Sequence, residues 1–129
     1  MRKLIIEHLR NIVNESEKIK VDLSLVRIKK QWVNNLLVFS PYYENKPIGG
    51  FRLKKFEDGY KVESVSIYEA YRNNGIGKNM YLHMIKTLQK ENMPLYSDNA
   101  QTPAAKAIWE KLVDKGIAVR TENGYKSKN

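Results

Sequence analysis

The sequence of 129 residues contains no cysteine, and it has only 4 prolines and 7 glycines. The lack of cysteine excludes disulfides and cysteine-ligated zinc, and it fits a reducing compartment such as the cytoplasm. Because 42% of the residues are hydrophobic and proline and glycine are scarce, the chain is neither a linker nor a low-complexity segment. We therefore expect a single folded domain over residues 1–129.

Long apolar runs are also missing from the sequence. No stretch approaches the roughly 20 consecutive apolar residues that a membrane-spanning helix requires. The first residues, MRKLIIEHLRNIV, place basic residues before apolar ones, as a signal peptide does. Charged residues interrupt that apolar part, however, and no small-residue cleavage site follows. We expect a soluble, cytoplasmic protein without a membrane segment.

Acidic residues are the minority among the charged ones, with 14 against 23 basic residues and a net charge of +9. The basic excess is similar in residues 1–60 and 61–129, so there is no basic tail. Such a surface attracts polyanions, whether nucleic acid, a phosphorylated cofactor or an acidic protein, although a plainly solvated surface is the simpler interpretation. The pairs Lys29–Lys30 and Lys54–Lys55 fit solvated faces. The two histidines, His8 and His83, lack metal-ligand spacing, so no metal site is expected.

The hydrophobic pattern predicts a mixed α/β domain. Strands are expected over 21–27, 36–40, 47–56 and from Tyr60 onward, a short strand over 95–97, and a closing hairpin around the turn at 122–124. Helices are expected over 3–13, over 76–88, and from Thr102–Pro103 to a C-terminal cap at Gly116. A hairpin turn at 57–59 is expected to join the strand over 47–56 to the strand that begins at Tyr60.

The strand that begins at Tyr60 changes its alternation. Tyr60 and Val62 occupy even positions, whereas Val65 and Ile67 occupy odd ones. In a regular strand this change would move the apolar side chains to the opposite face. One extra residue near Glu63 and Ser64, forming a β-bulge, would restore the face. A strand covered on both faces is the alternative.

The segment YRNNGIGK, residues 71–78, carries the clearest chemical signal because it stands between a predicted strand and a predicted helix. Its two glycines permit close approach of the backbone to a ligand, and the new helix presents free N–H groups. Together with Arg72 and Lys78 these features form a phosphate cradle. A strand-to-helix turn without a ligand is the alternative.

Two other phosphate-binding motifs do not fit this segment. The dinucleotide fingerprint needs a third glycine where Met80 stands. A Walker A loop ending at Gly77–Lys78 needs glycine in place of Arg72 and a hydroxyl residue in place of Asn79.

The pattern R-x-x-G-x-G, after a strand ending in V-S-I and at the start of an amphipathic helix, resembles the pyrophosphate-binding motif of the GNAT acetyltransferases. The resemblance covers residues 47 to about 125, and the segment SDNAQTPAAKAIWEKL is similar to short members of this family encoded by bacteriophages. It implies a GNAT-like, mostly antiparallel central sheet, flanked by helices, whose fourth and fifth strands splay to admit a thioester. It also implies acetyl-CoA as co-substrate and no metal cofactor.

The resemblance assigns binding roles to particular residues. The main chain of Val65 and Ile67 would contact the pantetheine arm and the acetyl carbonyl. An asparagine common in the last helix of the family is Thr102 here, although Asn99 lies close in sequence. The pyrophosphate would be held by the phosphate loop, namely Arg72, Asn73, Asn74, Gly75, Ile76, Gly77 and Lys78.

Catalysis is less well defined by the sequence. An amine must lose a proton before it attacks, and Glu63 on the fourth strand is the candidate base, with Tyr68 and Glu69 as alternatives. Glu63 fits a solvated strand residue equally well. The family's last helix commonly carries a tyrosine acid where this chain has Trp109, whose indole N–H only donates hydrogen bonds. Tyr96 or Tyr125 would substitute for it, the thiolate would leave unaided, or the protein would catalyse poorly.

We therefore expect an N-acetyltransferase that moves acetyl from acetyl-CoA to a primary amine by direct attack in a ternary complex. The alternatives are a nucleic-acid or protein binding module with this fold and little catalysis, and a coenzyme-binding regulator without turnover. The basic surface favours an acidic macromolecule as acceptor, and a monomer or a homodimer fits equally. The aromatic residues Trp32, Tyr42, Tyr43 and Phe51 line a substrate groove or belong to the core.

Overall fold

The computed structural model describes residues 18–128, so the helix expected over 3–13 lies outside the described residues. The two α-helices described are α2 (Ile76–Gln89) and α3 (Pro103–Asp114), and two short 3-10 helices are η1 (Leu23–Leu25) and η2 (Glu69–Tyr71). The strands are β1 (Arg27–Val33), β2 (Leu36–Tyr43), β3 (Lys46–Pro47), β4 (Gly49–Phe56), β5 (Gly59–Ile67), β6 (Leu95–Tyr96), β7 (Ala118–Thr121) and β8 (Gly124–Ser127). Neither α2 nor α3 is long and apolar enough to cross a bilayer.

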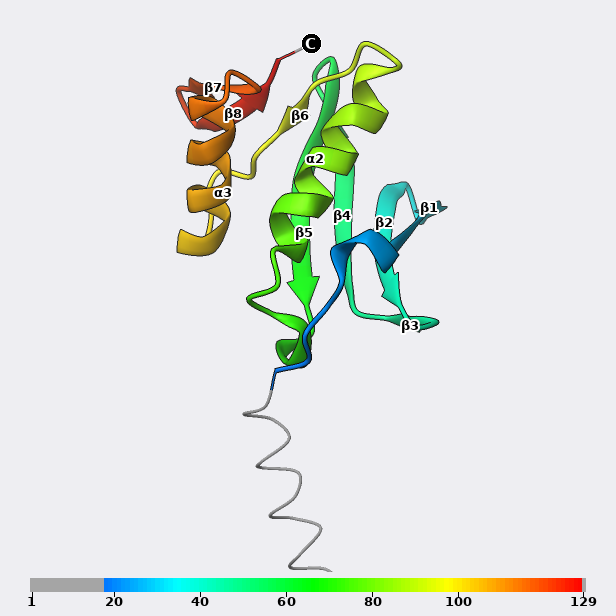
Figure 1. The fold of residues 1–129 in the computed structure, drawn as a ribbon. Coiled ribbons are helices and arrows are strands. Elements are labelled where there is room, and N and C mark those ends of the chain that lie inside the picture. Colours follow the sequence, from blue (N-terminus) through cyan, green and yellow to red (C-terminus); the bar gives the residue numbers. More distant parts are fainter. Residues whose placement is uncertain (1–17, 129) are drawn as a thin grey trace, which may run out of the picture.

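The strands form one open sheet in the order β1-β2-β4-β5-β6-β8-β7, with β3 beside β2 (Figure 1). Every neighbouring pair is antiparallel except β5 and β6. This mixed, mostly antiparallel sheet flanked by helices confirms the predicted fold class. It also places the phosphate loop, residues 72–78, after β5 and η2 and across the start of α2.

Helix α2 covers one face of the sheet and supplies much of the core. Its buried residues recur at helical spacing, as the sequence predicts, and they pack against strand residues such as Phe39, Phe51 and Leu53. The burial of this stripe fixes α2, and with it the position of the phosphate loop. The buried residues of α2 are Ile76, Met80, Tyr81, Met84, Ile85 and Leu88.

Helix α3 begins and ends where the sequence predicts. The Thr102 hydroxyl accepts a hydrogen bond from the Ala105 N–H (3.1 Å), and Pro103 occupies the first helical position. Gly116 has a φ of +75° just beyond the helix, as a C-terminal cap requires. The indole of Trp109 anchors α3, because it is fully buried and stacks on Tyr125 with the ring planes 5° apart.

The prediction of a strand over 21–27 is wrong for most of that range. Residues 23–25 form η1, and β1 begins only at Arg27. The Asp22 carboxylate accepts hydrogen bonds from both the N–H and the hydroxyl of Ser24, at 3.0 and 2.7 Å. This local capping competes with strand pairing, and an alternation of apolar residues does not reveal it.

The predicted β-bulge is present in β5. Arg52 on β4 pairs with Ser64, whereas the next residue, Leu53, pairs with Val62, so Glu63 has no partner. The extra residue returns Val65 to the face that carries Phe51, with which it pairs. Val65 lies on the core face yet is 42% exposed, because the sheet opens beside it.

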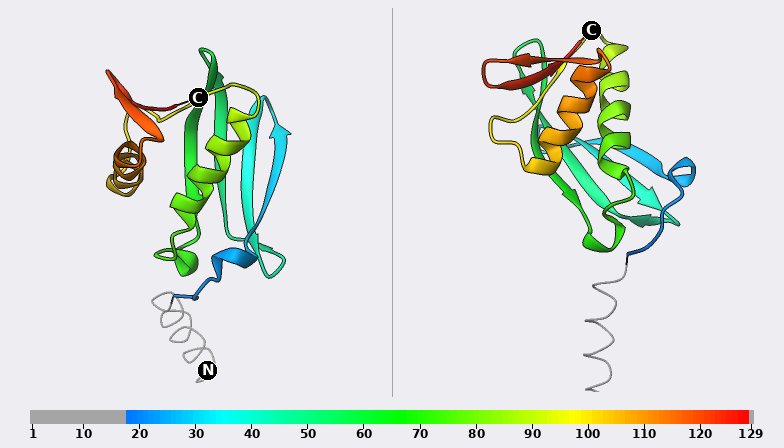
Figure 2. Two further views of the ribbon diagram at one scale, coloured as in Figure 1. Left: turned by 45° about the horizontal axis from the view of Figure 1, so that its top comes forward. Right: turned by 60° about the vertical axis from the view of Figure 1, so that its left-hand side comes forward.

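The sheet opens between β5 and β6. These strands pair only at Tyr60–Leu95 and Lys61–Tyr96. Beyond that point Ser97 turns to β8, since its N–H donates to the Tyr125 carbonyl (3.0 Å). The outer half of β5 therefore has β4 on one side and no strand of the described chain on the other. Figure 2 shows α3 and the β7–β8 hairpin beyond this opening.

Candidate functional site

A groove of about 670 Å³ lies where β5, the start of α2 and α3 meet. Its walls include Val65 and Ile67 from β5, Gly75 and Gly77 from the phosphate loop, and Ile108 from α3. A smaller cavity of about 190 Å³ continues inward between β5 and α3, with Val65, Ile67 and Ile108 lining both spaces. The opening of the sheet therefore leads directly to the phosphate loop.

The start of α2 leaves hydrogen-bond donors free at the groove. Gly75 caps the helix with a φ of +78°, a conformation that a residue with a side chain rarely adopts. The first helical bond runs from the Asn79 N–H to the Gly75 carbonyl (3.1 Å). Within residues 18–128, the N–H groups of Gly75 to Lys78 make no hydrogen bond. With the positive end of the helix dipole, they can bind an anionic group.

Gly77 holds the groove's walls close together. A Cβ at this position would lie 3.0 Å from the Ile108 side chain and 3.7 Å from that of Ile67. A larger residue would therefore push α2 away from α3 and β5. The two glycines have different tasks, since Gly75 permits the backbone turn and Gly77 permits the close packing.

The Asn74 side chain fixes the loop. Its amide oxygen accepts from the Val21 N–H (2.9 Å), and its nitrogen donates to the carbonyls of Ile19 (2.8 Å) and Tyr71 (3.0 Å). These bonds tie the loop to the chain that precedes β1. The side chain of Asn74 is thereby occupied, and only its main chain can face a ligand.

Arg72 is bound to β5 through one nitrogen. Its Nε donates to the Ile67 carbonyl (2.8 Å), while Arg72 itself lines the groove and is exposed. The remaining guanidinium N–H groups can donate to an anion at the loop. Asn73 also lines the groove, with a φ of +67°.

The main chain of Val65 and Ile67 faces the opening. The Tyr68 N–H donates to the Ile48 carbonyl (3.0 Å), one residue beyond the pair Ile67–Gly49. In an antiparallel ladder this pattern turns the N–H and C=O of Ile67 away from β4, and those of Val65 by the same alternation. The Ile67 carbonyl already accepts from Arg72, so the other groups are the free ones.

The inner cavity has one polar wall. Tyr81, Asp98 and Gln101 line it opposite Val62 and Val65. Burial, and then the nearby Asp98 carboxylate, raise the pKa of the Tyr81 hydroxyl well above its usual range, so this phenol stays protonated. One carboxylate oxygen of Asp98 is buried without a hydrogen-bond partner among the described residues.

The predicted base, Glu63, stands at the bulge and does not line the groove. Its carboxylate forms an exposed ion pair with Lys54 (3.8 Å). Because its neighbour Val62 points to the core, Glu63 points to the sheet face opposite α2. Of the alternatives, Glu69 pairs with Lys18 (4.0 Å) in η2, and Tyr68 is half exposed.

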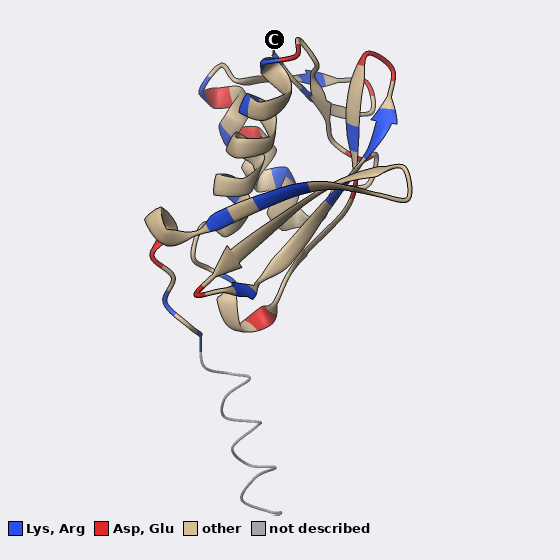
Figure 3. Ribbon diagram, turned by 90° about the vertical axis from the view of Figure 1, so that its right-hand side faces the viewer, with Lys and Arg blue, Asp and Glu red and all other residues tan. Residues whose placement is uncertain are grey.

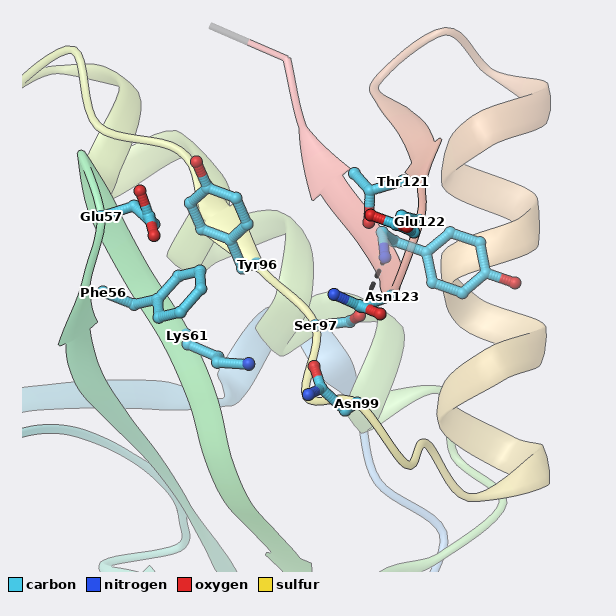
Figure 4. Close-up of a pocket in the computed structure, with 10 residues that line it drawn as sticks. Phe56, Glu57, Lys61, Tyr96, Ser97, Asn99, Thr121, Glu122 and Asn123 are labelled. Atoms are coloured by element: carbon cyan, nitrogen blue, oxygen red, sulfur yellow. Dashed lines mark hydrogen bonds between the residues drawn. The ribbon is translucent and has the colours of Figure 1, made fainter.

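Asn99 is not brought to the groove with the other predicted binding residues. It lines a separate hollow of about 240 Å³, with Lys61 and Phe56 on one side and the β7–β8 turn on the other (Figure 4). Ser97 borders this hollow and accepts a hydrogen bond from the Tyr125 N–H (2.9 Å).

The two tyrosines considered as substitute acids are engaged with carboxylates. The Tyr96 hydroxyl donates to Asp58 (2.6 Å), which raises the pKa of Tyr96 to about 12. The Tyr125 hydroxyl donates to Glu110, which raises the pKa of Tyr125. Trp109 is fully buried and lines neither the groove nor the inner cavity.

Among the other aromatic candidates, Tyr43 and Phe51 belong to the core, whereas Trp32 is 60% exposed on β1. Tyr42 is half-buried and lines a further hollow beside η1 and β1.

Within residues 18–128, no three side chains of the metal-ligating types lie together.

Sequence reasoning missed the α3 wall of the groove. Ala104, Ala107, Ile108 and Lys111 recur three or four residues apart and face the groove together. The sequence did contain a signal for this wall, namely a second stripe of residues at helical spacing that includes two alanines. Small side chains leave space for a ligand, whereas a stripe that faces the core would carry larger residues. Lys111 adds a positive charge near Lys78 at the same groove.

The family model for the acetyltransferase (GNAT) family matches residues 6–113. The chain belongs to this family. None of the curated proteins compared with the sequence matches it.

Solved structures with the same fold include three acetyltransferases. A GNAT family acetyltransferase from Elizabethkingia anophelis, with acetyl-CoA bound, is 13% identical over 76% of this chain and 78% of its own, with a TM-score of 0.60. An IAA acetyltransferase from Bacillus cereus is 12% identical over 79% and 95%, with a TM-score of 0.59. The ribosomal-protein-S18-alanine N-acetyltransferase from Escherichia coli is 20% identical over 74% and 66%, with a TM-score of 0.55.

Proposed function

We propose that this member of the GNAT family binds acetyl-CoA in the groove and transfers its acetyl group to a primary amine. The observation that carries the proposal is the meeting of two features in one place. The unpaired outer edge of β5 and the free N–H groups at the start of α2 line the same groove. A ligand with an anionic middle and a neutral, hydrogen-bonding arm fits this combination.

The residues present suit the coenzyme chemically. The N–H groups of 75–78, with Arg72 and Lys78, would hold the pyrophosphate, because they combine the helix dipole with two positive charges. The free main-chain groups of Val65 would bond to the amides of the pantetheine arm along the edge of β5. When bound, the coenzyme supplies an acetyl group activated as a thioester.

The acceptor amine would approach from the sheet face opposite α2. Glu63 lies on that face, at the bulge beside the opening of the sheet. Its exposed carboxylate would accept a proton from the ammonium form of the acceptor, directly or through water, and leave the neutral amine that attacks. Attack within a ternary complex needs no nucleophile from the protein. The C–N bond would form as the thioester C–S bond breaks, and coenzyme A would leave as a thiolate that takes a proton from solvent. The Tyr81 hydroxyl stays protonated and lines the inner cavity, so it would donate a hydrogen bond to the part of the ligand that enters this cavity.

The experiment that tests this function is incubation of the protein with acetyl-CoA and a panel of primary amines. The panel should include small alkylamines, amino-terminal peptides, lysine peptides and acidic proteins. We expect release of free thiol together with a mass gain of one acetyl group on an amine, both dependent on enzyme. Absence of transfer to every amine, with acetyl-CoA bound normally, would instead support a coenzyme-binding regulator.

A second candidate function is binding of nucleic acid, and the edge strand β1 favours it. Arg27, Lys29 and Lys30 are exposed along β1, and Trp32 is exposed further along the same strand; Figure 3 shows the basic residues of this strand. Lys30 lies on the same sheet face as Trp32, and a cation beside an exposed aromatic ring suits a backbone phosphate and a stacked base. Affinity for single-stranded nucleic acid that falls steeply with salt, and is lost in Trp32→Ala, would support this function.

A further inference from the structure

Three lysines from the start of α2 and the C-terminal end of α3 lie near one another, and two of them line the groove. Lys78 lies in the first turn of α2, and Lys111 and Lys115 lie one turn apart at the end of α3. Lys78 and Lys111 both line the groove. A polar contact with Lys115, and then the positive charges of Lys115 and Lys111, lower the pKa of Lys78.

Among residues 18–128, no carboxylate forms an ion pair with this cluster. The ion pairs within residues 18–128 are Lys18–Glu69, Lys54–Glu63 and Arg120–Glu110, and none includes a lysine of the cluster. Three like charges brought together without a counterion repel one another. Such an arrangement is relieved by an anion with more than one negative charge.

The position of the cluster relative to the groove identifies that anion. The inner cavity and the edge of β5 form one end of the site, and the N–H groups of 75–78 form its middle. Coenzyme A has a matching linear order: the thioester and pantetheine arm, then the pyrophosphate, then a ribose that carries a phosphate monoester. With the thioester at β5 and the pyrophosphate at the loop, that ribose would lie in the part of the groove away from the inner cavity. Lys78 and Lys111 line the groove but not the inner cavity.

We propose that Lys111 and Lys115 bind the ribose 3′-phosphate of coenzyme A, together with Lys78, which would contact both this phosphate and the pyrophosphate, so that the protein distinguishes coenzyme A from dephospho-coenzyme A. The inference rests on the proposed function and extends it to the far end of the cofactor. A phosphate monoester carries nearly two negative charges at neutral pH, and three ammonium groups supply donors for its oxygens. Lys111 and Lys115 would contact the ribose 3′-phosphate of the cofactor and would not contact the thioester.

The test compares binding of acetyl-CoA and acetyl-dephospho-CoA by titration calorimetry, with inorganic phosphate as a third ligand. The variants are Lys111→Gln, Lys115→Gln and the double variant. Lys106→Gln is the matched control, because Lys106 is an exposed lysine on the same helix that does not line the groove. Unliganded melting temperatures verify that every variant folds, and the Gln variants should not lose stability, since they relieve repulsion.

We expect wild-type protein to bind acetyl-CoA roughly tenfold more tightly than acetyl-dephospho-CoA, a modest factor because exposed ion pairs are individually weak. The double variant should lose this difference while its affinity for acetyl-dephospho-CoA stays the same, and Lys106→Gln should keep it. High salt should reduce the difference in the wild type.

Equal affinity of the wild-type protein for the two cofactors would overturn the inference and leave the acetyltransferase proposal standing. Failure to bind either cofactor would overturn the proposed function and the inference together. Competition by inorganic phosphate at low concentration, with no cofactor preference, would contradict the inference, because it would make the cluster a site for free phosphate.

Discussion

Glu63 is the one residue of β5 that the bulge leaves without a partner on β4. Its proposed role in proton removal can be separated from any role in folding, because its pair with Lys54 is exposed. Exposed pairs contribute up to about 1 kcal/mol to stability. A change at Glu63 should therefore act on turnover and leave the fold nearly unaffected.

We predict that Glu63→Gln lowers kcat by about 100-fold or more, since general-base catalysis contributes about that much. The affinity for acetyl-CoA should stay unchanged, because Glu63 does not line the groove. Steady-state kinetics and calorimetry measure the two quantities. Glu91→Gln, which removes an exposed carboxylate just beyond the end of α2 that lies away from the groove, is the control. Wild-type turnover in Glu63→Gln would remove Glu63 from the mechanism.

The Tyr96–Asp58 hydrogen bond gives a second residue-scale prediction. It raises the pKa of Tyr96 to about 12 and lowers that of Asp58. The bond therefore stabilises the fold between the unfolded pKa values of the two groups, which are near 4 and 10. This stabilisation disappears as pH falls through the lowered pKa of Asp58, and as pH rises through the raised pKa of Tyr96.

We predict that Asp58→Asn returns the pKa of Tyr96 from about 12 toward 10, the value for free tyrosine. Ultraviolet titration of the variant against wild type should show one tyrosine ionising earlier. Glu57→Gln is the control, because the charge of Glu57 is the smallest of the causes that raise the pKa of Tyr96. Identical titration curves for wild type and Asp58→Asn would contradict the hydrogen bond.

At the scale of elements, α3 uses two faces for two purposes. Trp109 and Leu112 are buried and hold the helix to the domain, whereas Ala104 and Ala107 lie exposed along the groove. Alanine on a groove wall has no packing partner to lose. Enlarging it should fill the groove without disturbing the core.

We predict that Ala107→Phe weakens acetyl-CoA binding by about tenfold or more, which corresponds to about 1.4 kcal/mol, because the larger ring would occupy space in the groove that Ala107 lines. The free energy of unfolding should change by no more than about 0.5 kcal/mol, as for other surface substitutions. Calorimetry and chemical denaturation provide the two measurements. Lys106→Phe places the same ring one residue away, off the groove. Full affinity in Ala107→Phe would exclude this groove as the cofactor site.

Elements governed by local chemistry were predictable from the sequence. Thr102–Pro103 starts α3 because a hydroxyl cap and a proline act within one turn. The bulge at Glu63 was predictable because the apolar residues of one strand change from even to odd positions. The 3-10 turn at Leu23–Leu25 was missed because the Asp22 cap competes with an alternating pattern. In each case the outcome was decided within a few residues.

Features that depend on contacts between distant segments were not predictable. Lys78 and Lys115 are separated by 37 positions in sequence, and only the packing of α2 beside α3 brings them together. Asn99 was assigned by sequence proximity to Thr102, but the turn of Ser97 toward β8 places it in a different hollow. The phosphate loop was predictable because it is a sequence motif, whereas the α3 wall of the groove was not.

At the scale of the whole molecule, a ligand that binds only the folded chain stabilises every element at once. The stabilisation is about 2.7 kcal/mol when the ligand is present at about 100 times its Kd. A thermal shift thus tests whether the domain is an acetyl-CoA-binding protein before any acceptor is known. Two glycines with positive φ provide a matched pair for this test, namely Gly75 (+78°) at the groove and Gly116 (+75°) beyond α3.

The most direct measurement is thermal unfolding of wild type, Gly75→Glu and Gly116→Glu, each with and without acetyl-CoA. Both variants impose a similar backbone strain, but only Gly75→Glu places a carboxylate at the free N–H groups of α2. We predict that acetyl-CoA raises the melting temperature of wild type and Gly116→Glu by several degrees and leaves Gly75→Glu unchanged. An equal rise in all three proteins would contradict the placement of the cofactor at the loop, and no rise in wild type would contradict acetyl-CoA binding altogether.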